Sequence, residues 1–234
     1  AGLGPEVPAD VETSKKERLA ALSFEELLRE SLRLSPNLSN EEKDRMVDLL
    51  LRYGKIFRNS ELGEIRGYEL DLNLQGGRPV RVTNQRWTPV QAELIEREVT
   101  RLRKMKIIEM CDGPWASRLV LVPNSDGSIR VCVDFREVNK QLSMHAYPSP
   151  DIEECLQSLF GQKYFTIMDA EKGFHQLKLK ESSRDMTGFA TPSGLYRYAR
   201  APMGLNRMPA IFQKLMELIL AGLTWKCASV FFDD

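Results

Sequence analysis

The sequence predicts an α+β fold, in which capped helices and antiparallel strands are combined within 234 residues. Three capping boxes mark helix starts, because a Ser or Thr N-cap is followed three residues later by Glu or Gln; they begin at Ser23, Ser39 and Thr88. Two apolar runs flank an Asp126-Gly127 turn, which is typical of a β-hairpin. A chain of this length can bury one sizeable core or two smaller lobes.

Residues 1–20 are polar and proline-containing, so we expect a linker there. After this linker, helices are expected at five places. The helices at Ser23 and Ser39 should form a small pair that docks on the main body. The third has Pro89 at its first position and an apolar stripe at i, i+3 and i+4 spacing. That stripe is formed by Leu94, Ile95, Val99, Leu102 and Met105. Two later helices are expected over 152–159 and 208–221.

Strands are expected between these helices. The segment 64–82 should be extended, and the hairpin should pair 119–122 with 129–134. On its second strand Arg130, Cys132 and Asp134 share one face, because successive side chains alternate. The remaining expected strands cover 164–169, 175–180, parts of 187–198, and 227–234.

Two of these apolar runs end in aspartate: Asp169 closes one, and Asp233-Asp234 closes the other. A carboxylate out of water is costly unless a cation or partner neutralises it. If the two strands are neighbours, Asp169 lies beside Asp233 in an all-oxygen site suited to Mg²⁺. Taken singly, each aspartate is better explained as a turn or helix cap.

Composition narrows the function classes. Hydrophobic content of 42% and charged content of 28% are ordinary for a globular protein, and no apolar stretch or signal peptide indicates a membrane partner. Four separated cysteines indicate reduced intracellular thiols, and two histidines make a zinc site unexpected. The net charge of zero disfavours a nucleic-acid binder, although one stretch is basic. It contains Arg197, Arg200, Arg207 and Lys214.

Four motifs follow one another along the chain. The first is Pro114-Trp115-Ala116-Ser117 with Asp126-Gly127-Ser128-x-Arg130-x-Cys132-Val133-Asp134-Phe135-Arg136-x-x-Asn139, and the second is Phe165-x-x-x-Asp169-x-x-x-Gly173-Phe174-His175-Gln176. The third is Ala201-Pro202-Met203-Gly204-Leu205-x-x-x-Pro209-Ala210-x-Phe212-Gln213, and the fourth is Phe231-Phe232-Asp233-Asp234. Together, in this order and over roughly residues 85–234, they resemble the reverse transcriptase of gypsy-type LTR retrotransposons. Any one of these motifs is a weak signal, whereas four in series leave little room for coincidence.

The resemblance implies a right-hand polymerase fold with fingers and a partial palm, in which an antiparallel sheet is backed by helices. Residues 1–62 would be an N-terminal linker and helical extension, and 63–234 the reverse transcriptase. Fingers would cover about 85–145 and 177–205, and palm about 146–176 and 206–234. The thumb has no counterpart in these residues. We therefore expect a piece of a longer chain that is weak or inactive as a polymerase by itself.

The reaction implied is addition of deoxynucleotides to a primer 3′ end with two Mg²⁺ ions roughly 3.5–4 Å apart, for which Mn²⁺ could substitute. The resemblance assigns catalysis to Asp169, Asp233 and Asp234, with the Ala170 carbonyl as a further metal ligand. Phe174 would exclude a 2′-hydroxyl, although a core aromatic is the alternative explanation of this ring. Arg130, Met203 and Gly204 would contact the triphosphate. Template contacts are assigned to Arg136, Asn139, Pro209 and Gln213, where surface hydrogen bonding is an equal alternative.

The implied partners are an RNA or DNA template with primer, deoxynucleoside triphosphates, and the rest of a Pol polyprotein with protease, ribonuclease H and integrase. The implied location is intracellular, in cytoplasmic virus-like particles or in the nucleus. Pro123, Asn124 and Ser125 stand where members of the resembled family often carry lysines, so one triphosphate or template contact is expected to be missing or weakened. A non-catalytic retroelement remnant that binds nucleic acid or protein therefore stays the alternative. An RNA polymerase or intron-type enzyme fits less well, because Phe174 disfavours ribonucleotides.

Overall fold

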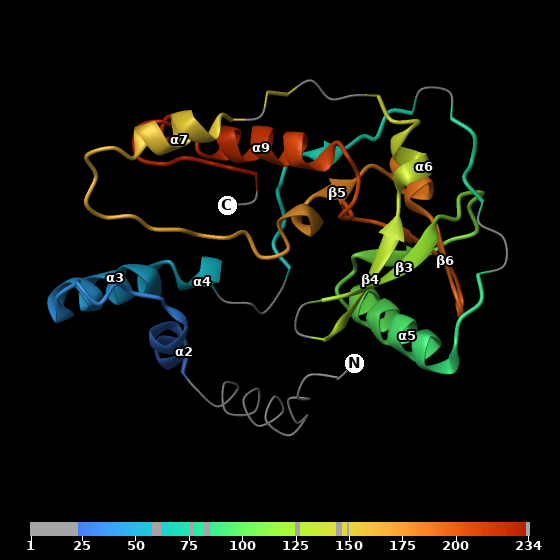
Figure 1. The fold of residues 1–234 in the computed structure, drawn as a ribbon, viewed down its shortest axis with the longest axis horizontal. Helices are drawn as coiled ribbons and strands as arrows, with labels where there is room; N and C mark the ends of the chain where they lie inside the picture. Colours follow the sequence, from blue (N-terminus) through green and yellow to red (C-terminus); the bar gives the residue numbers. More distant parts are fainter. Residues whose placement is uncertain are drawn as a thin grey trace, which may run out of the picture. The chain divides into compact units, whose positions relative to one another are not determined.

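The computed structural model describes residues 23–57, 62–74, 77–81, 85–124, 127–143, 147–148 and 150–232. The chain divides into two compact units, Ala1–Glu61 and Leu62–Asp234. Three predicted features lie outside the described residues: the linker over 1–20, Asp126 of the hairpin turn, and the Asp233-Asp234 pair. The described elements can be followed in Figure 1.

The smaller unit is helical, with α2 (Phe24–Ser31), α3 (Asn40–Arg52) and α4 (Gly54–Phe57). Both predicted capping boxes are confirmed: the Ser23 and Ser39 hydroxyls accept from the backbone N–H groups three residues on, and the returning carboxylates are in place. Gly54 is required beside Phe24, since a Cβ there would lie 2.9 Å from the ring. Leu28 and Val47 are buried between these helices.

The larger unit combines helices with short strands. Its α-helices are α5 (Pro89–Lys104), α6 (Arg136–Asn139), α7 (Ile152–Ser158), α8 (Glu181–Arg184) and α9 (Met208–Ile219), and its 3₁₀ helices are η1 (Gly173–Gln176) and η2 (Asp185–Thr187). Its strands are β1 (Glu69–Leu70), β2 (Ile108–Met110), β3 (Arg118–Pro123), β4 (Ile129–Asp134), β5 (Lys178–Leu179), β6 (Phe189–Thr191) and β7 (Gly194–Tyr198). The predicted α+β class is confirmed.

Within the described residues the strands form three small sheets. The predicted hairpin is confirmed as antiparallel β3–β4, with Arg130 opposite Val122 and Asp134 opposite Arg118. A second sheet has the antiparallel order β2–β7–β6, and β1 pairs with β5 in parallel. The bridge between Ser117 and Phe189 connects the hairpin to the second sheet.

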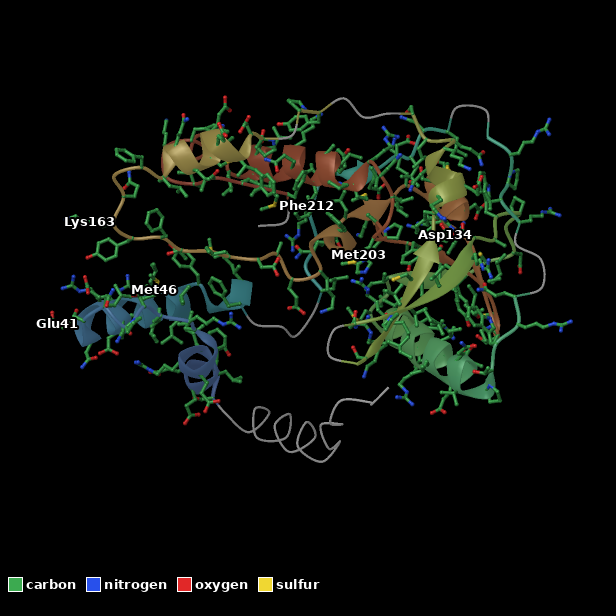
Figure 2. All side chains as sticks on the ribbon, viewed as in Figure 1. Glu41, Met46, Asp134, Lys163, Met203 and Phe212 are labelled. Carbon is green, nitrogen blue, oxygen red and sulfur yellow. The ribbon has the colours of Figure 1, made fainter. Side chains whose placement is uncertain are left out.

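One hydrophobic core unites this larger unit. The Thr88 capping box starts α5 as predicted, and the buried face of α5 is Ile95, Val99 and Leu102. Aromatic rings from different elements meet in the same core, where Tyr198 contacts Phe135 and Phe189 edge-on or tilted. Phe212 of α9, labelled in Figure 2, is 1% exposed. The core therefore holds together α5, the β3–β4 hairpin, the β2–β7–β6 sheet and α9.

Two predicted strands are wrong. Residues 164–169 have no regular structure, and Phe165 and Ile167 are 59% and 88% exposed. Residues 227–232 likewise form no strand, and Phe232 has a left-handed φ of 58°. A strand persists only when its N–H and C=O groups pair with a neighbour, and no described residue of the sheets pairs with either segment. The predicted strand over 175–180 is shortened to β5, because η1 occupies its first half.

Across the part of the chain that the structure describes, we find no helix with the length and apolar character needed to span a membrane.

Candidate active site

The Asp169 turn begins where the irregular segment 162–169 meets η1. Asp169 is exposed, and the next residue, Ala170, is half-buried against the core. The Gly173 N–H donates to the Ala170 carbonyl at 2.9 Å, and the Gln176 amide donates to the Glu171 carbonyl at 2.9 Å. Lys172 adopts a left-handed φ of 50° between them. These bonds fix the backbone directly after Asp169, so the carboxylate is attached to a defined turn.

Phe174 continues this turn into the core. Its ring meets the Phe212 ring edge-to-face, with centroids 5.4 Å apart and planes at 82°. Gly173 permits the contact, since a Cβ on residue 173 would come within 2.8 Å of the Phe212 ring. Phe174 is only half-buried. One side of this ring is therefore fixed by packing, while another part stays accessible. This position suits both explanations of Phe174, a ring that excludes a 2′-hydroxyl and a core aromatic.

Gln213, the residue after Phe212, points inward and is 1% exposed. Its side-chain amide donates to the Val230 carbonyl at 3.1 Å, and its oxygen accepts from the Phe232 N–H at 2.7 Å. The template contact predicted for Gln213 is therefore not made by a surface amide in this structure, because the amide is engaged with the chain leading to Asp233. Consecutive residues of α9 thus hold both aspartate-bearing segments, Phe212 through Phe174 and Gln213 directly.

The hairpin carries a second group of predicted residues. Arg130 is exposed on β4. The Nε and Nη2 groups of Arg136 donate hydrogen bonds to the Asp134 carboxylate, and the shortest of these bonds is 2.7 Å. This guanidinium, and then its backbone N–H, lower the pKa of Asp134. The positive charge of Arg136 is in turn largely offset by this carboxylate, although the Arg136 side chain remains 83% exposed.

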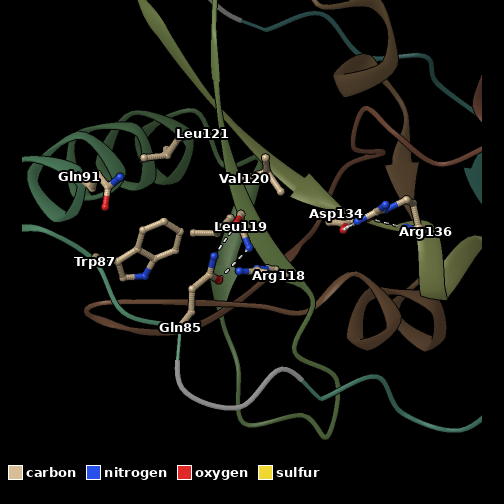
Figure 3. A pocket seen from close by; sticks show the side chains of 9 residues that line it. All are labelled: Gln85, Trp87, Gln91, Arg118, Leu119, Val120, Leu121, Asp134 and Arg136. Carbon is tan, nitrogen blue, oxygen red and sulfur yellow. Dashed lines mark hydrogen bonds and ion pairs between the residues drawn. The ribbon is translucent and has the colours of Figure 1, made fainter.

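A cavity of about 360 Å³ lies beside this ion pair (Figure 3). Residues from the start of α5, from β3 and from the end of β4 line it, among them Trp87, Arg118 and Asp134. The Gln85 side chain, which lines this cavity, is bonded to the backbone of β3: it donates to the Leu119 carbonyl at 2.6 Å and accepts from the Leu119 N–H at 3.1 Å.

The loop before α9 is fixed to α6 by Asn139. Its amide donates to the Gly204 carbonyl at 2.9 Å and accepts from the Asn206 N–H at 3.0 Å. Gly204 has a φ of 92°, a conformation that L side chains rarely adopt. Met203, labelled in Figure 2, is 54% exposed beside it. Pro209 is half-buried in the first turn of α9.

Most of the predicted basic stretch is engaged internally. Arg197 contacts the carboxylates of Glu109, Glu181 and Asp185. Arg200 pairs with Glu64 at 3.3 Å. Arg207 is 8% exposed and donates to the Leu72 carbonyl at 2.9 Å. These arginines stabilise the fold, and among the four residues only Lys214 is exposed.

The donors at the Asp169 turn fit a hard cation. An exposed carboxylate and a carbonyl oxygen with a second lone pair are ligands that Mg²⁺ accepts. Within the described ranges, no group of three or more His, Cys, Asp or Glu is arranged to hold a metal ion. Asp233 and Asp234, which complete the predicted set, lie outside those ranges.

The sequence analysis missed Glu217 and Tyr147. Glu217 accepts from the Gln213 amide at 2.7 Å and from the Tyr147 hydroxyl. A signal was present, because Gln213 interrupts an apolar helix face and Glu217 follows it by four residues.

Comparison with known proteins identifies the family. Residues 122–234 match the family model described as "Reverse transcriptase (RNA-dependent DNA polymerase)". These residues belong to the reverse transcriptase family. The matched range contains both aspartate-bearing segments and all of α9. The chain thus contains a segment of this family, and the relatives that it matches include retrotransposon Pol polyproteins.

Among those relatives is the "Retrovirus-related Pol polyprotein from transposon 412" of Drosophila melanogaster, 38% identical over 173 residues, which are 71% of this chain and 14% of that protein. The corresponding polyprotein from transposon 297 of the same organism is 32% identical over 240 residues, covering 97% of this chain and 22% of that protein. An enzymatic polyprotein of Cauliflower mosaic virus (strain NY8153) is 30% identical over 159 residues, covering 66% of this chain and 23% of that protein. The chain thus spans less than a quarter of these relatives.

Solved structures establish the fold. The foamy viral protease-reverse transcriptase in complex with RNA/DNA hybrid matches with a TM-score of 0.75 at 21% identity, covering 100% of this chain and 30% of that one. The same viral protein in complex with double-stranded DNA matches with a TM-score of 0.73, covering 100% and 39%. The predicted polymerase fold is therefore confirmed for this reverse transcriptase segment.

Proposed function

We propose that this segment provides fingers and palm residues of an RNA-directed DNA polymerase that adds deoxynucleotides to a primer 3′ end. The observation that carries the proposal is the arrangement around α9. Phe212 packs on the Asp169 turn through Phe174, and Gln213 bonds the backbone that leads to Asp233. Two segments about sixty residues apart in sequence are therefore tied to adjacent residues of one helix.

The chemical roles follow from the side chains. Asp169, Asp233, Asp234 and the Ala170 carbonyl would hold Mg²⁺, which, when bound, offsets the charge that develops on attacking and leaving oxygens; Mn²⁺ could take its place. Phe174 would block a 2′-hydroxyl from beside the sugar. Arg130 would meet the triphosphate with a charge-assisted guanidinium contact.

Positioning of the nucleotide and template falls to the loop before α9. Gly204 and the exposed Met203 would allow backbone to approach the nucleotide, with Asn139 holding the loop in place. Arg136 and Pro209 would contact the template. Because Asp134 neutralises Arg136, its contact would be weaker than that of a free arginine.

The proposed partners are a primed RNA or DNA template, deoxynucleoside triphosphates, and the other domains of a Pol polyprotein. The proposed location is intracellular, within virus-like particles in the cytoplasm or in the nucleus. The relatives named above support a polyprotein origin, and the foamy viral protein supports nucleic acid as the ligand class.

Primer extension tests the proposal. We would measure dTTP incorporation on poly(rA)·oligo(dT) with Mg²⁺, using this chain and one that continues past residue 234 as its relatives do. Incorporation should occur in the longer chain and fall by several orders of magnitude in Asp169→Asn and Asp233→Asn. Asp48→Asn, an exposed aspartate of α3 in the smaller unit, is the matched control and should keep full activity. Activity that survives Asp169→Asn would overturn the assignment.

A non-catalytic nucleic-acid or protein binder is the second candidate. The internal engagement of Arg197, Arg200 and Arg207 and the net charge of zero leave few cations for phosphate contacts, which favours a non-catalytic chain with a protein partner within this candidate. A mobility-shift assay with labelled RNA–DNA hybrid tests this candidate. If neither chain incorporates dTTP in primer extension but the hybrid is still bound, the result would favour this candidate over the polymerase.

A further inference from the structure

A second cavity, of about 310 Å³, lies in the larger unit and shares no lining residue with the candidate active site. Four of its six lining residues are cations, which come from different elements, and one is a carboxylate. The six are Lys106 after α5, Lys178 of β5, Arg184 of α8, Ala199 and Arg200 after β7, and Glu64. Like charges repel when they converge, unless anions offset them, so the charge balance of this cavity is informative.

Three of the four cations are held in place by carboxylates. Glu64 accepts from Lys178 Nζ at 2.8 Å and from Arg200 Nη2 at 3.3 Å. The hydrogen bond from Lys178 is the largest cause of the lowered pKa of Glu64. Arg184 contacts Glu181 at 2.7 Å. These cationic groups therefore have defined positions on the cavity wall, which reduces the entropy lost when a ligand binds.

Lys106 is the cation that lacks such a partner. Its ammonium group forms no hydrogen bond or ion pair with any residue that the structure describes. The ion-paired group around the cavity is balanced, with four cations and four carboxylates. Its cations are Lys178, Arg184, Arg197 and Arg200, and its carboxylates are Glu64, Glu109, Glu181 and Asp185. Lys106 therefore adds a surplus positive charge at the cavity, which a bound anion would balance.

The backbone of Lys106 provides a second observation. Its φ is 55°, and it directly follows the C-cap of α5, where glycine is usual because no Cβ opposes this conformation. The turn is closed by bonds from the Lys106 N–H to the Arg103 carbonyl at 2.9 Å and from the Ile107 N–H to the Leu102 carbonyl at 3.0 Å. Such unfavourable backbone conformations cluster at functional sites. A role for the ammonium group explains a lysine where glycine would be more stable.

Phosphate fits the donors of this cavity. A guanidinium offers a planar fork to two phosphate oxygens, and an ammonium adds a compact point charge. Within the described residues Arg184 Nη2 and Arg200 Nε form no hydrogen bond, so both can donate to a ligand. Small-molecule sites measure about 300–1,000 Å³. A cavity at the lower end of this range suits a compact anion.

We propose that this cavity binds a phosphate group, whose charge Lys106 balances. The phosphate is either free, as inorganic phosphate or pyrophosphate, or carried on a nucleic-acid strand. The site is independent of the polymerase function proposed above, because the two share no residue.

The variants each change one side chain of the cavity or its surroundings. Lys106→Gly removes the ammonium group and suits the left-handed backbone, so Tm should rise while phosphate binding weakens. Lys106→Arg keeps the positive charge. Lys104→Gln is the matched control, because Lys104 is exposed at the end of α5 and does not line the cavity. Glu64→Gln removes the carboxylate from the wall.

Calorimetric titration of pyrophosphate into the 234-residue chain, without divalent cations, measures the affinity. The wild type should bind with a Kd of about 1 mM or lower. Lys106→Gly should raise this Kd about tenfold, the loss expected for one hydrogen bond to a charged group, and Lys106→Arg should bind more tightly than Lys106→Gly. Lys104→Gln should stay within about twofold of the wild type. Glu64→Gln should bind more tightly than the wild type, since a negative charge facing the ligand is removed.

Fluorescence anisotropy of a labelled single-stranded oligonucleotide distinguishes the two sources of phosphate. If a nucleic-acid strand carries it, Lys106→Gly should bind the oligonucleotide more weakly than Lys104→Gln does, and pyrophosphate should compete with the oligonucleotide. If the phosphate is free, the two variants should bind the oligonucleotide equally and differ only in pyrophosphate affinity.

Three results would overturn the phosphate site. The first is a wild type that does not bind pyrophosphate, together with equal oligonucleotide affinity in Lys106→Gly and Lys104→Gln. The second is an equal loss of pyrophosphate affinity in these two variants. The third is tighter binding of hexaglutamate than of pyrophosphate with the same dependence on Lys106, which would assign the cavity to an acidic peptide. If Lys106→Gly does not fold, Glu64→Gln decides, and pyrophosphate affinity that is unchanged or weaker in it refutes the site.

Discussion

Replacement of Gly173 by alanine tests the packing that holds the Asp169 turn. The new Cβ would lie 2.8 Å from Phe212 Cζ and 3.3 Å from Ala170 Cβ, whereas favourable carbon contacts are roughly 3.5–4.0 Å. The Phe212 ring is 1% exposed and stacks edge-to-face on Phe174. The methyl group can be accommodated only if this ring moves into space that other side chains already fill.

The expected cost follows from two opposing effects. Overpacking a filled core costs about 1–3 kcal/mol. Loss of glycine restricts the unfolded chain and stabilises by about 0.4–1 kcal/mol. The clash is the larger effect, so Gly173→Ala should lower the free energy of unfolding by about 1–2 kcal/mol. At about 2–4 °C per kcal/mol for a domain of this size, Tm should fall by about 2–8 °C.

Urea and thermal unfolding followed by circular dichroism measure this difference. The decisive control is Gly173→Ala combined with Phe212→Leu, which removes the ring atom that the new methyl meets. The double variant should be more stable than the sum of the single effects by at least about 0.5 kcal/mol. Gly173→Ala with wild-type stability, or strict additivity in the double variant, would refute the proposed contact between residue 173 and the ring.

Three further predictions concern the hydrogen bonds of Arg207 and Asn139 and the burial of His175. Arg207→Met leaves the Leu72 carbonyl without its buried donor, so the free energy of unfolding in urea should fall by about 1–3 kcal/mol; an unchanged midpoint would show that the bond is dispensable. Asn139→Ala removes both anchors of the loop before α9, and hydrogen exchange at the Asn206 amide should become faster while α5 is unaffected; equal rates in both proteins would contradict this. Burial lowers the pKa of His175, so the unfolded chain binds its proton more readily and stability rises with pH. The His175 contribution should be complete above about pH 6.5 and decline as pH falls through the lower folded pKa, a slope that His175→Gln should reduce in unfolding measured at pH 7 and pH 5.

Elements with local causes were predictable from sequence. The capping boxes at Ser23, Ser39 and Thr88 formed because donor and acceptor lie three residues apart and need no distant partner. The β3–β4 hairpin formed for a similar reason, since its turn joins strands adjacent in sequence. The segments 164–169 and 227–232 were predicted as strands on apolar composition alone. Composition cannot supply the pairing partner on which a strand depends.

The candidate site was likewise predictable from sequence only in part. The residue order around Asp169, Phe174 and Asp233 was enough to indicate the reverse transcriptase family and its chemistry. Sequence could not show that Gln213 faces inward, because an amide on α9 is compatible with either side until Val230 and Phe232 are placed against it. Nor could it show that Arg197 and Arg200 are neutralised, since their partners Glu109 and Glu64 come from distant parts of the chain.

The sequence by itself determined the helix starts, the hairpin, and the chemical identity of the aspartate motifs, because each depends on neighbouring residues or on residue type. Only the tertiary structure decided which polar side chains are exposed and which are used internally. Burial and hydrogen bonding depend on segments far apart in sequence that meet after folding. The pairing of Phe174 with Phe212, and of Gln213 with the backbone before Asp233, exists only in the folded protein.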